Sequence, residues 1–468
     1  MTASRSAVEG SEDTDPVADG YRETAIGGPL GRFAKVPAQS VGRGRWAGIL
    51  VPAWQPVAAI LSLAASVMVA LGVVQKSYCF ENGWGGDSVF WRACYSDLPN
   101  MYVSSGLSSG QLPYSTDALT QPIGTGFALW LLSFFTPDGE AGAAVFVGVW
   151  AVTAALLVMG LVVATVLTSR RDPWVAGVVA FSPLLVTLTL VGADLVGVVL
   201  VSLALLLWSR EREWAAGAVF ALAILSRTYA LVVLLAVVLV ALRAGRYRVA
   251  ARTAGTAVLG SLFVLLALRA VGLEVGAAYT AWLAGSAEFG SAQYLLSLAG
   301  QPLSVNLSTI VALGGWVFAI LAGSLMALGV KRRPRIAETA VVMLVIVILL
   351  AKAVPPQWAL WLLPLVALAK LPRRVYMSWM AAELVYFVAV WMHIPGESAP
   401  SRSLPAGWYA FLLVVRLAAL AWLAWSCYRQ AAARPPAPRA SAEAVLASEP
   451  DDGAGPVAGG RDRLLVTF

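Results

Sequence analysis

Long apolar stretches separated by short polar turns run along most of the chain. Those at 143–168 and 303–330 contain no charged residue. A helix needs about 20 residues to cross the hydrocarbon core of a bilayer, and fewer where neighbouring helices bury it. Unbroken apolar stretches also exclude an outer-membrane β-barrel, whose strands alternate apolar and polar residues. The pattern predicts an all-α polytopic membrane protein with about 12 transmembrane helices, near 49–74, 141–167, 174–192, 194–208, 214–226, 229–242, 253–272, 305–330, 336–353, 356–369, 375–393 and 404–427.

One further apolar segment, 122–137, does not fit this series. It is short and bounded by Pro122 and Pro137. Counting it as a span would place Arg170 and Arg171 on the outer side of the membrane. We therefore expect an amphipathic or re-entrant segment on the outer face.

Composition and charge agree with a membrane protein. The chain has 468 residues, of which 59% are hydrophobic and 13% charged, against about 25% charged in soluble domains. Its net charge of +7 does not indicate a nucleic-acid partner, because the basic residues cluster between spans. The positive-inside rule places these clusters, and both termini, in the cytoplasm. The clusters are Arg170 and Arg171, Arg210 and Arg212, Arg243 to Arg252, Lys331 to Arg335, and Lys370 to Arg374.

We expect three parts in the chain. Residues 1–48 and 428–468 are rich in small, polar and Pro residues, which predicts disordered cytoplasmic tails. Residues 49–427 form the transmembrane body. Within it, 75–140 is the longest break between spans and is expected to be the first extracytoplasmic loop. Loops of this length are usually functional.

Two of the three cysteines, Cys79 and Cys94, lie in this loop. On the oxidising side of a membrane, two nearby cysteines predict a disulfide that closes a short loop. The alternative is a pair of buried free thiols. We favour the disulfide.

Asp97 is the candidate catalytic residue in the loop. It follows Cys94, precedes a proline and lies between Tyr95 and Tyr102, where the chain can be held close to the membrane surface. A carboxylate held there can act as a general base on an acceptor hydroxyl. For most other acids in the loop, simple solvation is the better interpretation.

Three of the ionisable residues at or within the spans are candidate site residues. Asp194 is either a functional residue or the N-cap of the next helix. Arg227 and Arg416 are candidates for binding a lipid phosphate, because a guanidinium can donate two hydrogen bonds to it. The alternative for each arginine is a structural pair with an acid such as Asp194.

Prolines at 355 and 356 precede Gln357 and Trp358, with Trp361 one turn on. Proline breaks a helix and frees backbone groups beside a cavity, where the two tryptophans can stack on a sugar. The alternative is an interfacial aromatic belt. The single histidine, His393, cannot form a metal site alone, and no nucleotide-binding or hydrolase motif is present. We therefore expect no metal and no cofactor.

Taken in order, these motifs resemble a known pattern. The chain resembles bacterial membrane proteins of glycosyltransferase family 87, in the GT-C superfamily. The resemblance spans most of 75–395 and is carried by Asp97, Tyr102, the glycines and Pro-Tyr of 106–114, Pro122, Gly-Ala-Asp-Leu at 192–195, Ser-Arg-Thr-Tyr at 226–229, Gly290-Ser291 with Tyr294, Pro356-Gln357-Trp358, and Leu-Trp-Leu-Leu-Pro at 360–364.

The resemblance implies a GT-C-like fold in the bacterial plasma membrane and an inverting sugar transfer on its outer face. The donor is a polyprenyl-phosphate sugar, typically of mannose, and the acceptor is a lipid or glycan. Asp97 is then the general base, and Arg227 and Arg416 bind the donor phosphate. The expected substrate-binding residues are Tyr102, Tyr114, Asp194, Gln357, Trp358 and Trp361.

This sequence departs from the family pattern at several positions, including Gln121-Pro122-Ile123 and 359–361. Relatives tend to have Asn-Trp-Asp where Gly192-Ala193-Asp194 stands, and lysine where Arg227 stands. A secondary transporter or lipid-sugar flippase is the alternative function, because a dozen spans with broken helices suit transporters as well. A non-catalytic relative with the same fold is a third possibility.

Overall fold

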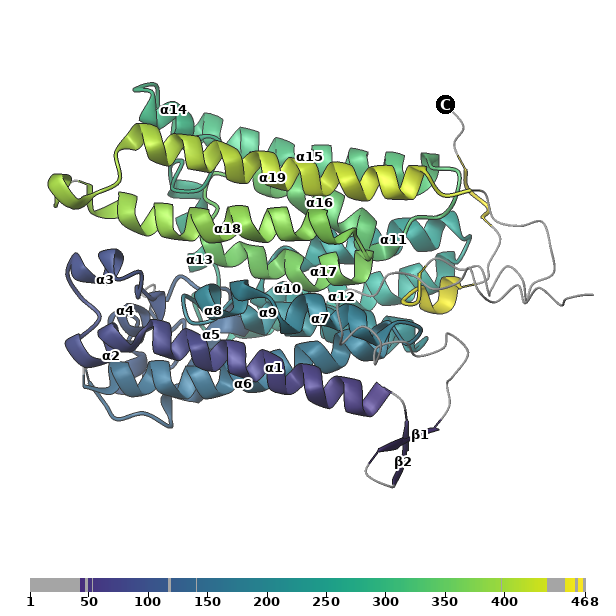
Figure 1. Cartoon of the computed structure of the whole chain (residues 1–468), viewed down its shortest axis with the longest axis horizontal. Helices are drawn as coiled ribbons and strands as arrows, with labels where there is room; N and C mark the ends of the chain where they lie inside the picture. The colour runs from purple at the N-terminus through teal and green to yellow at the C-terminus, as the bar shows by residue number, and fades with distance from the viewer. Residues whose placement is uncertain are drawn as a thin grey trace, which may run out of the picture.

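The structure is a computed structural model, and the main body it describes is a single bundle of helices (Figure 1). Six helices are long and apolar enough to cross a bilayer, and several apolar helices of 10–17 residues lie among them. The prediction of an all-α polytopic membrane protein is confirmed. The described residues are 43–46, 49–52, 54–116, 119–139, 141–396, 398–435, 451–458 and 462–465.

The long helices carry apolar side chains on outward faces, as a lipid-facing surface requires. Phe263 and Phe318, for example, are 73% and 59% exposed. The long helices are α1 (Trp54–Gln75), α6 (Gly142–Thr168), α12 (Tyr247–Ala270), α15 (Val305–Gly329), α18 (Arg373–His393) and α19 (Ala406–Ala432).

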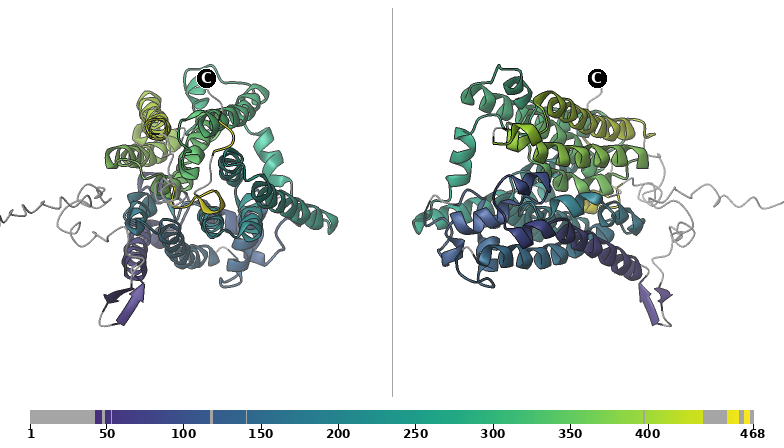
Figure 2. Two further views of the ribbon diagram at one scale, coloured as in Figure 1. Left: turned by 90° about the vertical axis from the view of Figure 1, so that its right-hand side faces the viewer. Right: turned by 60° about the vertical axis from the view of Figure 1, so that its left-hand side comes forward.

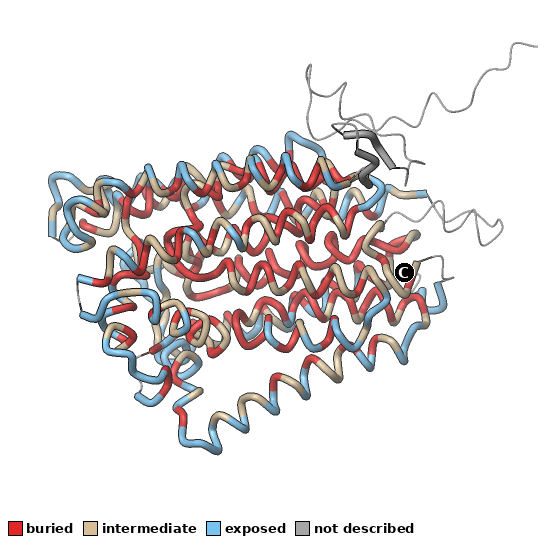
Figure 3. Tube along the Cα trace, turned by 90° about the horizontal axis from the view of Figure 1, so that it is seen from below, coloured by how far each residue is buried: buried red, intermediate tan, exposed pale blue. Residues whose placement is uncertain are grey.

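Shorter helices fill the interior of the bundle, where buried residues predominate (Figure 3). Most residues of α16 and α17 are buried, which suits helices that are apolar on all sides. The shorter helices are α9 (Leu195–Ser209), α10 (Glu213–Ser226), α11 (Ala230–Arg243), α16 (Ile336–Leu350) and α17 (Ala359–Ala369).

Two predicted spans differ from the structure. The first helix begins at Trp54 and not at 49, because β2 (Ile49–Pro52) pairs with β1 (Arg43–Trp46) in an antiparallel hairpin. The predicted span 174–192 is broken into η4 (Pro173–Ala176), α7 (Gly177–Ala180) and α8 (Pro183–Leu188). The break at Pro183 follows from its missing N–H group, and Ser182 caps the new helix by accepting from Leu184 N.

The segment expected to lie on the outer face contains one short helix, α5 (Ile123–Ser133). Its 11 residues extend about 16 Å, too short to cross a bilayer. Its end exposes Leu131, Phe134 and Phe135. This geometry agrees with the prediction of a segment that does not span the membrane.

The bundle has two ends with different chemistry. We call the end where α1 begins and α19 stops the tail end, at the right in Figure 1. The opposite end, which holds α2 (Ser77–Asn82), α3 (Ser88–Trp91) and α4 (Asp97–Ser104), is the loop end. Because successive helices run back and forth, all five predicted basic clusters fall at the tail end, in its turns and in the adjoining ends of helices. Asp97 lies at the other end.

The sequence predicted a disordered C-terminal tail, but parts of this tail are ordered. Helix α19 continues to Ala432, and residues 451–458 and 462–465 cross the tail end of the bundle (Figure 2, left). Asp452 pairs with Lys370 at 2.7 Å and Asp462 with Arg243 at 2.8 Å. Acidic side chains thus anchor an otherwise small-residue segment. Nearly all of the predicted N-terminal tail, 1–48, lies outside the described residues.

Candidate active site

Asp97 is the first residue of α4, and the turn before it is fixed from both sides. Ser96 caps the helix by accepting from Leu98 N at 3.3 Å. The backbone N–H of Asp97 donates to the carbonyl of Val191 at 2.8 Å. The loop that carries Asp97 is therefore attached to the connection between α8 and α9, nearly one hundred residues later.

A second carboxylate faces Asp97 across Gly192. A methyl group placed on Gly192 would lie 3.6 Å from Asp97 Oδ2 and 3.5 Å from Asp194 Oδ2. The side-chain amide of Gln357 donates to Asp97 Oδ2 at 3.3 Å. Gly192 thus lies beside three polar groups, the side chains of Asp97, Asp194 and Gln357.

Asp194 is engaged by two donors and does not cap its helix. Arg227 donates to it through Nε at 2.8 Å and Nη2 at 3.2 Å, and Trp361 Nε1 donates at 2.8 Å. Asp194 stands at the N-cap position of α9 but makes no capping hydrogen bond. The N-cap alternative is therefore wrong. The pairing of Arg227 with Asp194, which the sequence left open, is present.

Small residues and amides around Arg227 set its orientation. A methyl group on Gly197 would lie 2.8 Å from Arg227 Cγ, so only glycine lets the arginine lie across α9. Arg227 Nη1 also donates to Gln121 Oε1 at 3.0 Å. The backbone carbonyl of Gln121 in turn accepts from the Tyr114 hydroxyl at 2.9 Å.

Three aromatic rings stack beside this ion pair. Tyr229 and Trp361 are parallel with ring centres 4.7 Å apart, and Trp358 covers the Trp361 ring at 4.3 Å. The Tyr229 hydroxyl and Gln357 Oε1 are buried and make no hydrogen bond within the described part of the chain. Buried polar atoms normally have partners, so these two unpaired atoms are unusual.

The environment of Asp97 shifts its proton affinity. Burial raises the pKa of the Asp97 carboxyl to about 6, and the nearby charge of Asp194 acts in the same direction. A hydrogen bond from Tyr95 and the charges of Lys76 and Arg227 oppose this rise. Asp97 therefore changes protonation close to neutral pH, where a general base is most effective.

Three predicted site residues lie apart from this cluster. Tyr102 stacks on Phe146 and donates to the carbonyl of Pro137 at 2.6 Å, so it packs the base of the loop. Tyr114 acts through Gln121, as described above. Neither tyrosine supplies a free polar atom for a substrate.

Arg416 is also outside the cluster. It is 1% exposed, pairs with Glu383 at 2.9 Å and donates to the carbonyl of Val354 at 2.9 Å. Arg416 therefore forms a structural ion pair, which was the alternative to phosphate binding. Its partner is Glu383, whereas the sequence suggested an acid such as Asp194. Because the guanidinium is already engaged by Glu383 and Val354, we do not retain the phosphate-binding role of Arg416.

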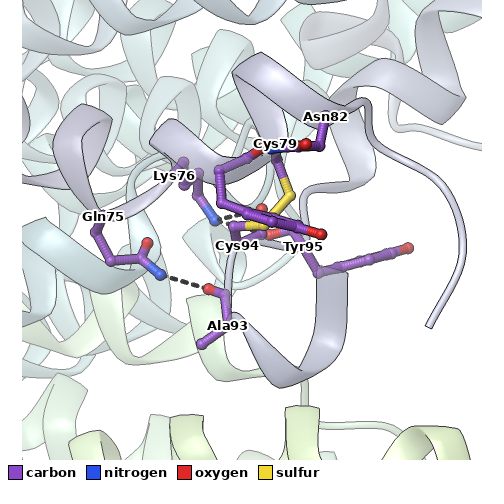
Figure 4. Close-up of a disulfide and its surroundings, with 8 residues drawn as sticks. Gln75, Lys76, Cys79, Asn82, Ala93, Cys94 and Tyr95 are labelled. Carbon is purple, nitrogen blue, oxygen red and sulfur yellow. Dashed lines mark hydrogen bonds between the residues drawn. A yellow bond between two sulfur atoms is a disulfide. The ribbon is translucent and has the colours of Figure 1, made fainter. Parts of the chain in front are cut away.

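Cys79 and Cys94 form the disulfide predicted from the sequence. It joins α2 to the turn before Asp97 (Figure 4).

The sequence did not single out Lys76, Tyr95, Gln121, Tyr229 or Glu383. An isolated lysine at the end of an apolar span was the available signal for Lys76. In the described residues, no group of three or more His, Cys, Asp and Glu side chains is arranged to hold a metal ion.

The fold and this site define a polytopic membrane protein with two neighbouring carboxylates at one end, a buried Asp194 and a half-buried Asp97. A family model described as Glycosyltransferase family 87 matches residues 120–354, half of the chain. The chain belongs to this family and is a membrane glycosyltransferase. Asp194 and Arg227 lie within the matched range, whereas Asp97 and Gln357 lie outside it. Searches of curated proteins and of solved structures gave no significant match.

Proposed function

We propose that this protein transfers a sugar, most simply mannose, from a polyprenyl-phosphate donor to a hydroxyl group of a lipid or glycan acceptor. The transfer takes place on the extracytoplasmic face of a bacterial plasma membrane and inverts the anomeric centre. The observation that carries the proposal is the half-buried Asp97 carboxylate facing the Asp194–Arg227 pair across Gly192. Family membership favours this function over a transporter or flippase.

Asp97 is the general base in this proposal. The acceptor oxygen attacks the anomeric carbon and forms the new glycosidic bond. The bond from that carbon to the phosphate oxygen breaks, and polyprenyl phosphate leaves with the electron pair. The proton of the acceptor hydroxyl passes to Asp97. A single displacement of this kind inverts the configuration and needs one carboxylate base.

Arg227 supplies positive charge for the leaving phosphate. Two of its nitrogen atoms are held by Asp194, but Nη1 bonds only to neutral acceptors, the Gln121 side chain and the carbonyl of Ser226. We infer that a donor phosphate oxygen replaces Gln121 at Nη1. A hydrogen bond between charged groups is stronger than one to a neutral amide, so this exchange is favourable.

The sugar is bound beside the aromatic stack. Trp358 is partly exposed, and its ring rests on Trp361, which orients a flat apolar surface toward the site. Gln357 Oε1 and the Tyr229 hydroxyl lack partners in the described structure and suit sugar hydroxyl groups. Asp194 then acts mainly by holding Arg227 and Trp361 in place.

The proposed orientation follows from charge. The tail end carries the basic clusters, which the positive-inside rule assigns to the cytoplasm together with both termini. The loop end, with Asp97 and the disulfide, then faces the oxidising side. A polyprenyl-phosphate donor in the outer leaflet has its phosphate at this level.

The test is a transfer assay with the purified protein in lipid nanodiscs. Polyprenyl-phosphate-[14C]mannose and GDP-[14C]mannose are supplied separately with extracted membrane lipids as acceptors. We expect labelled glycolipid only from the polyprenyl-phosphate donor. Label transferred only from the nucleotide sugar would overturn the proposed donor class. A panel of polyprenyl-phosphate pentoses and hexoses identifies the sugar.

A further inference from the structure

Lys76 is a fully buried cation directly behind the turn that carries Asp97. It follows the last residue of α1 and is 0% exposed. Its ammonium group donates to the carbonyl of Tyr95 at 2.7 Å and to that of Cys94 at 3.3 Å (Figure 4). These two carbonyls belong to the residues just before the N-cap of α4. A lysine is rarely buried so completely without a function or a charged partner.

Two further links hold the same turn. The disulfide joins Cys94 to Cys79 in α2, and the Gln75 side chain donates to the carbonyl of Ala93 (Figure 4). The disulfide and the hydrogen bond from the neutral Gln75 amide therefore already hold the turn at 93–95 in place. What Lys76 adds to these two is positive charge.

No carboxylate forms a direct salt bridge with Lys76 among the described residues. Burial lowers the pKa of the Lys76 ammonium to about 7, and the charge of Asp97 counteracts this. The charge of each group thus favours the charged form of the other. The charge that Lys76 provides acts on the carboxylate through space.

We propose that Lys76 is a positioning residue for the general base, whose charge keeps Asp97 ionised at neutral pH while its hydrogen bonds fix the turn before α4. This inference rests on the proposed function, because it assumes that Asp97 is the base. It assigns a role to a residue outside the family-matched range.

The sign of the effect follows from the groups that face Asp97. Asp194, at the start of α9, disfavours its ionisation, whereas Lys76, after α1, and Arg227, after α10, favour it. Tyr95 donates a hydrogen bond that also favours the carboxylate. The Gln357 amide donates as well but is neutral. Removing the charge of Lys76 leaves only Arg227 and the Tyr95 hydrogen bond against burial and Asp194, so the pKa of Asp97 must rise.

The experiment compares pH profiles of sugar transfer for the wild type and Lys76→Gln, in the same nanodiscs. The glutamine amide can still donate to a carbonyl but carries no charge. We expect the acid-side midpoint of turnover to move upward by on the order of one pH unit. Transfer at pH 6 should fall by about fivefold, with most of the activity regained near pH 8. Lys76→Met is a second uncharged variant with an apolar side chain of similar length and should show the same shift.

Gln75→Leu is the matched control. It removes the neighbouring hydrogen bond to the same turn without changing charge, so its midpoint should equal that of the wild type even if less active protein is recovered. The midpoint does not depend on the amount of folded protein. A purely structural role of Lys76 would lower turnover equally at every pH.

Two outcomes overturn the inference, and they differ from failure of the proposed function. An unchanged midpoint in either Lys76 variant, or total loss of transfer at every pH in both, would exclude the electrostatic role. Full activity of Asp97→Asn would instead reject Asp97 as the base and the proposed mechanism with it.

Discussion

Arg227 donates two hydrogen bonds to the carboxylate of Asp194, at 2.8 and 3.2 Å, from a position that is 9% exposed. The pair joins the end of α10 to the start of α9 at the level of Asp97. Paired charges at this depth are costly to separate, because either one alone would be buried without compensation. The pair is therefore both a structural link and, through the Nη1 atom of Arg227, the proposed contact with the donor phosphate.

Arg227→Ala should weaken donor binding and destabilise the protein. We expect the donor Michaelis constant to rise by about tenfold or more, the value for losing one charge-assisted hydrogen bond. Stability should fall by about 3–5 kcal/mol because Asp194 is left unpaired. Thermal unfolding in detergent and donor titration measure the two effects.

The double variant Arg227→Met/Asp194→Asn separates the two roles of this pair. Removing both charges should recover most of the lost stability but none of the donor affinity. Recovery of donor affinity in the double variant would show that Arg227 acts only as a structural partner of Asp194.

Glu383→Gln should destabilise the protein without changing donor binding. It leaves Arg416 buried without a counter-charge between α18 and α19, which costs about 3–5 kcal/mol. Thermal unfolding should show this loss, and Glu383→Gln/Arg416→Met should regain part of it. A raised donor Michaelis constant at unchanged stability would return Arg416 to the list of phosphate-binding residues.

Loss of the Cys79–Cys94 disulfide should lower both stability and turnover. The bond closes a loop with a sequence separation of 15, and cross-links of that size stabilise by about 3 kcal/mol. Cys79→Ser/Cys94→Ser should therefore unfold at lower temperature, and turnover should fall because Asp97 lies three residues beyond the bond. Full alkylation of both thiols in unreduced, denatured wild type would contradict the bond itself.

Asp97→Asn should make the protein more stable at pH 7.5. The pKa of Asp97 is about 6 in the folded state and 3.8 in its ordinary state, so the ionised form is disfavoured by folding. The ionised carboxylate therefore lowers the free energy of unfolding by at most about 3 kcal/mol. This destabilisation is present above pH 6 and disappears as the pH falls toward 4. Unfolding at pH 7.5 and at pH 4.5 measures the difference, which should shrink at the lower pH. An equal difference at both values would mean that the Asp97 carboxylate is not strained by burial.

The sequence predicted those features that depend on local pattern. Apolar length located most spans, proline bounded the short helix α5, and the neighbours of Asp97 in the long loop made it the candidate base. Two cysteines fifteen residues apart predicted the disulfide. Each of these signals is carried by neighbouring residues, so each can be found without knowing how helices pack.

Features that depend on packing could not be found in this way. Glu383 looked like one acid within a span, and only the contact between α18 and α19 makes it the partner of Arg416. The ligands of Lys76 are backbone carbonyls, which every residue carries. The tail around Asp452 has the composition of a disordered segment, and its order comes from Lys370 and the other basic residues of distant turns.

The most direct test of the central claim is sugar transfer by Asp97→Asn compared with Asp87→Asn. Asp87 lies in the same loop, and its carboxylate bonds to the exposed Ser398, so this variant controls for loss of a loop charge. With polyprenyl-phosphate-mannose as donor, we expect Asp97→Asn to lose at least a thousandfold in turnover at pH 7.5, about 4 kcal/mol of barrier, while Asp87→Asn retains wild-type activity. Transfer by Asp97→Asn within about tenfold of the wild type, a barrier change of roughly 1.4 kcal/mol, would contradict the assignment of Asp97 as the general base.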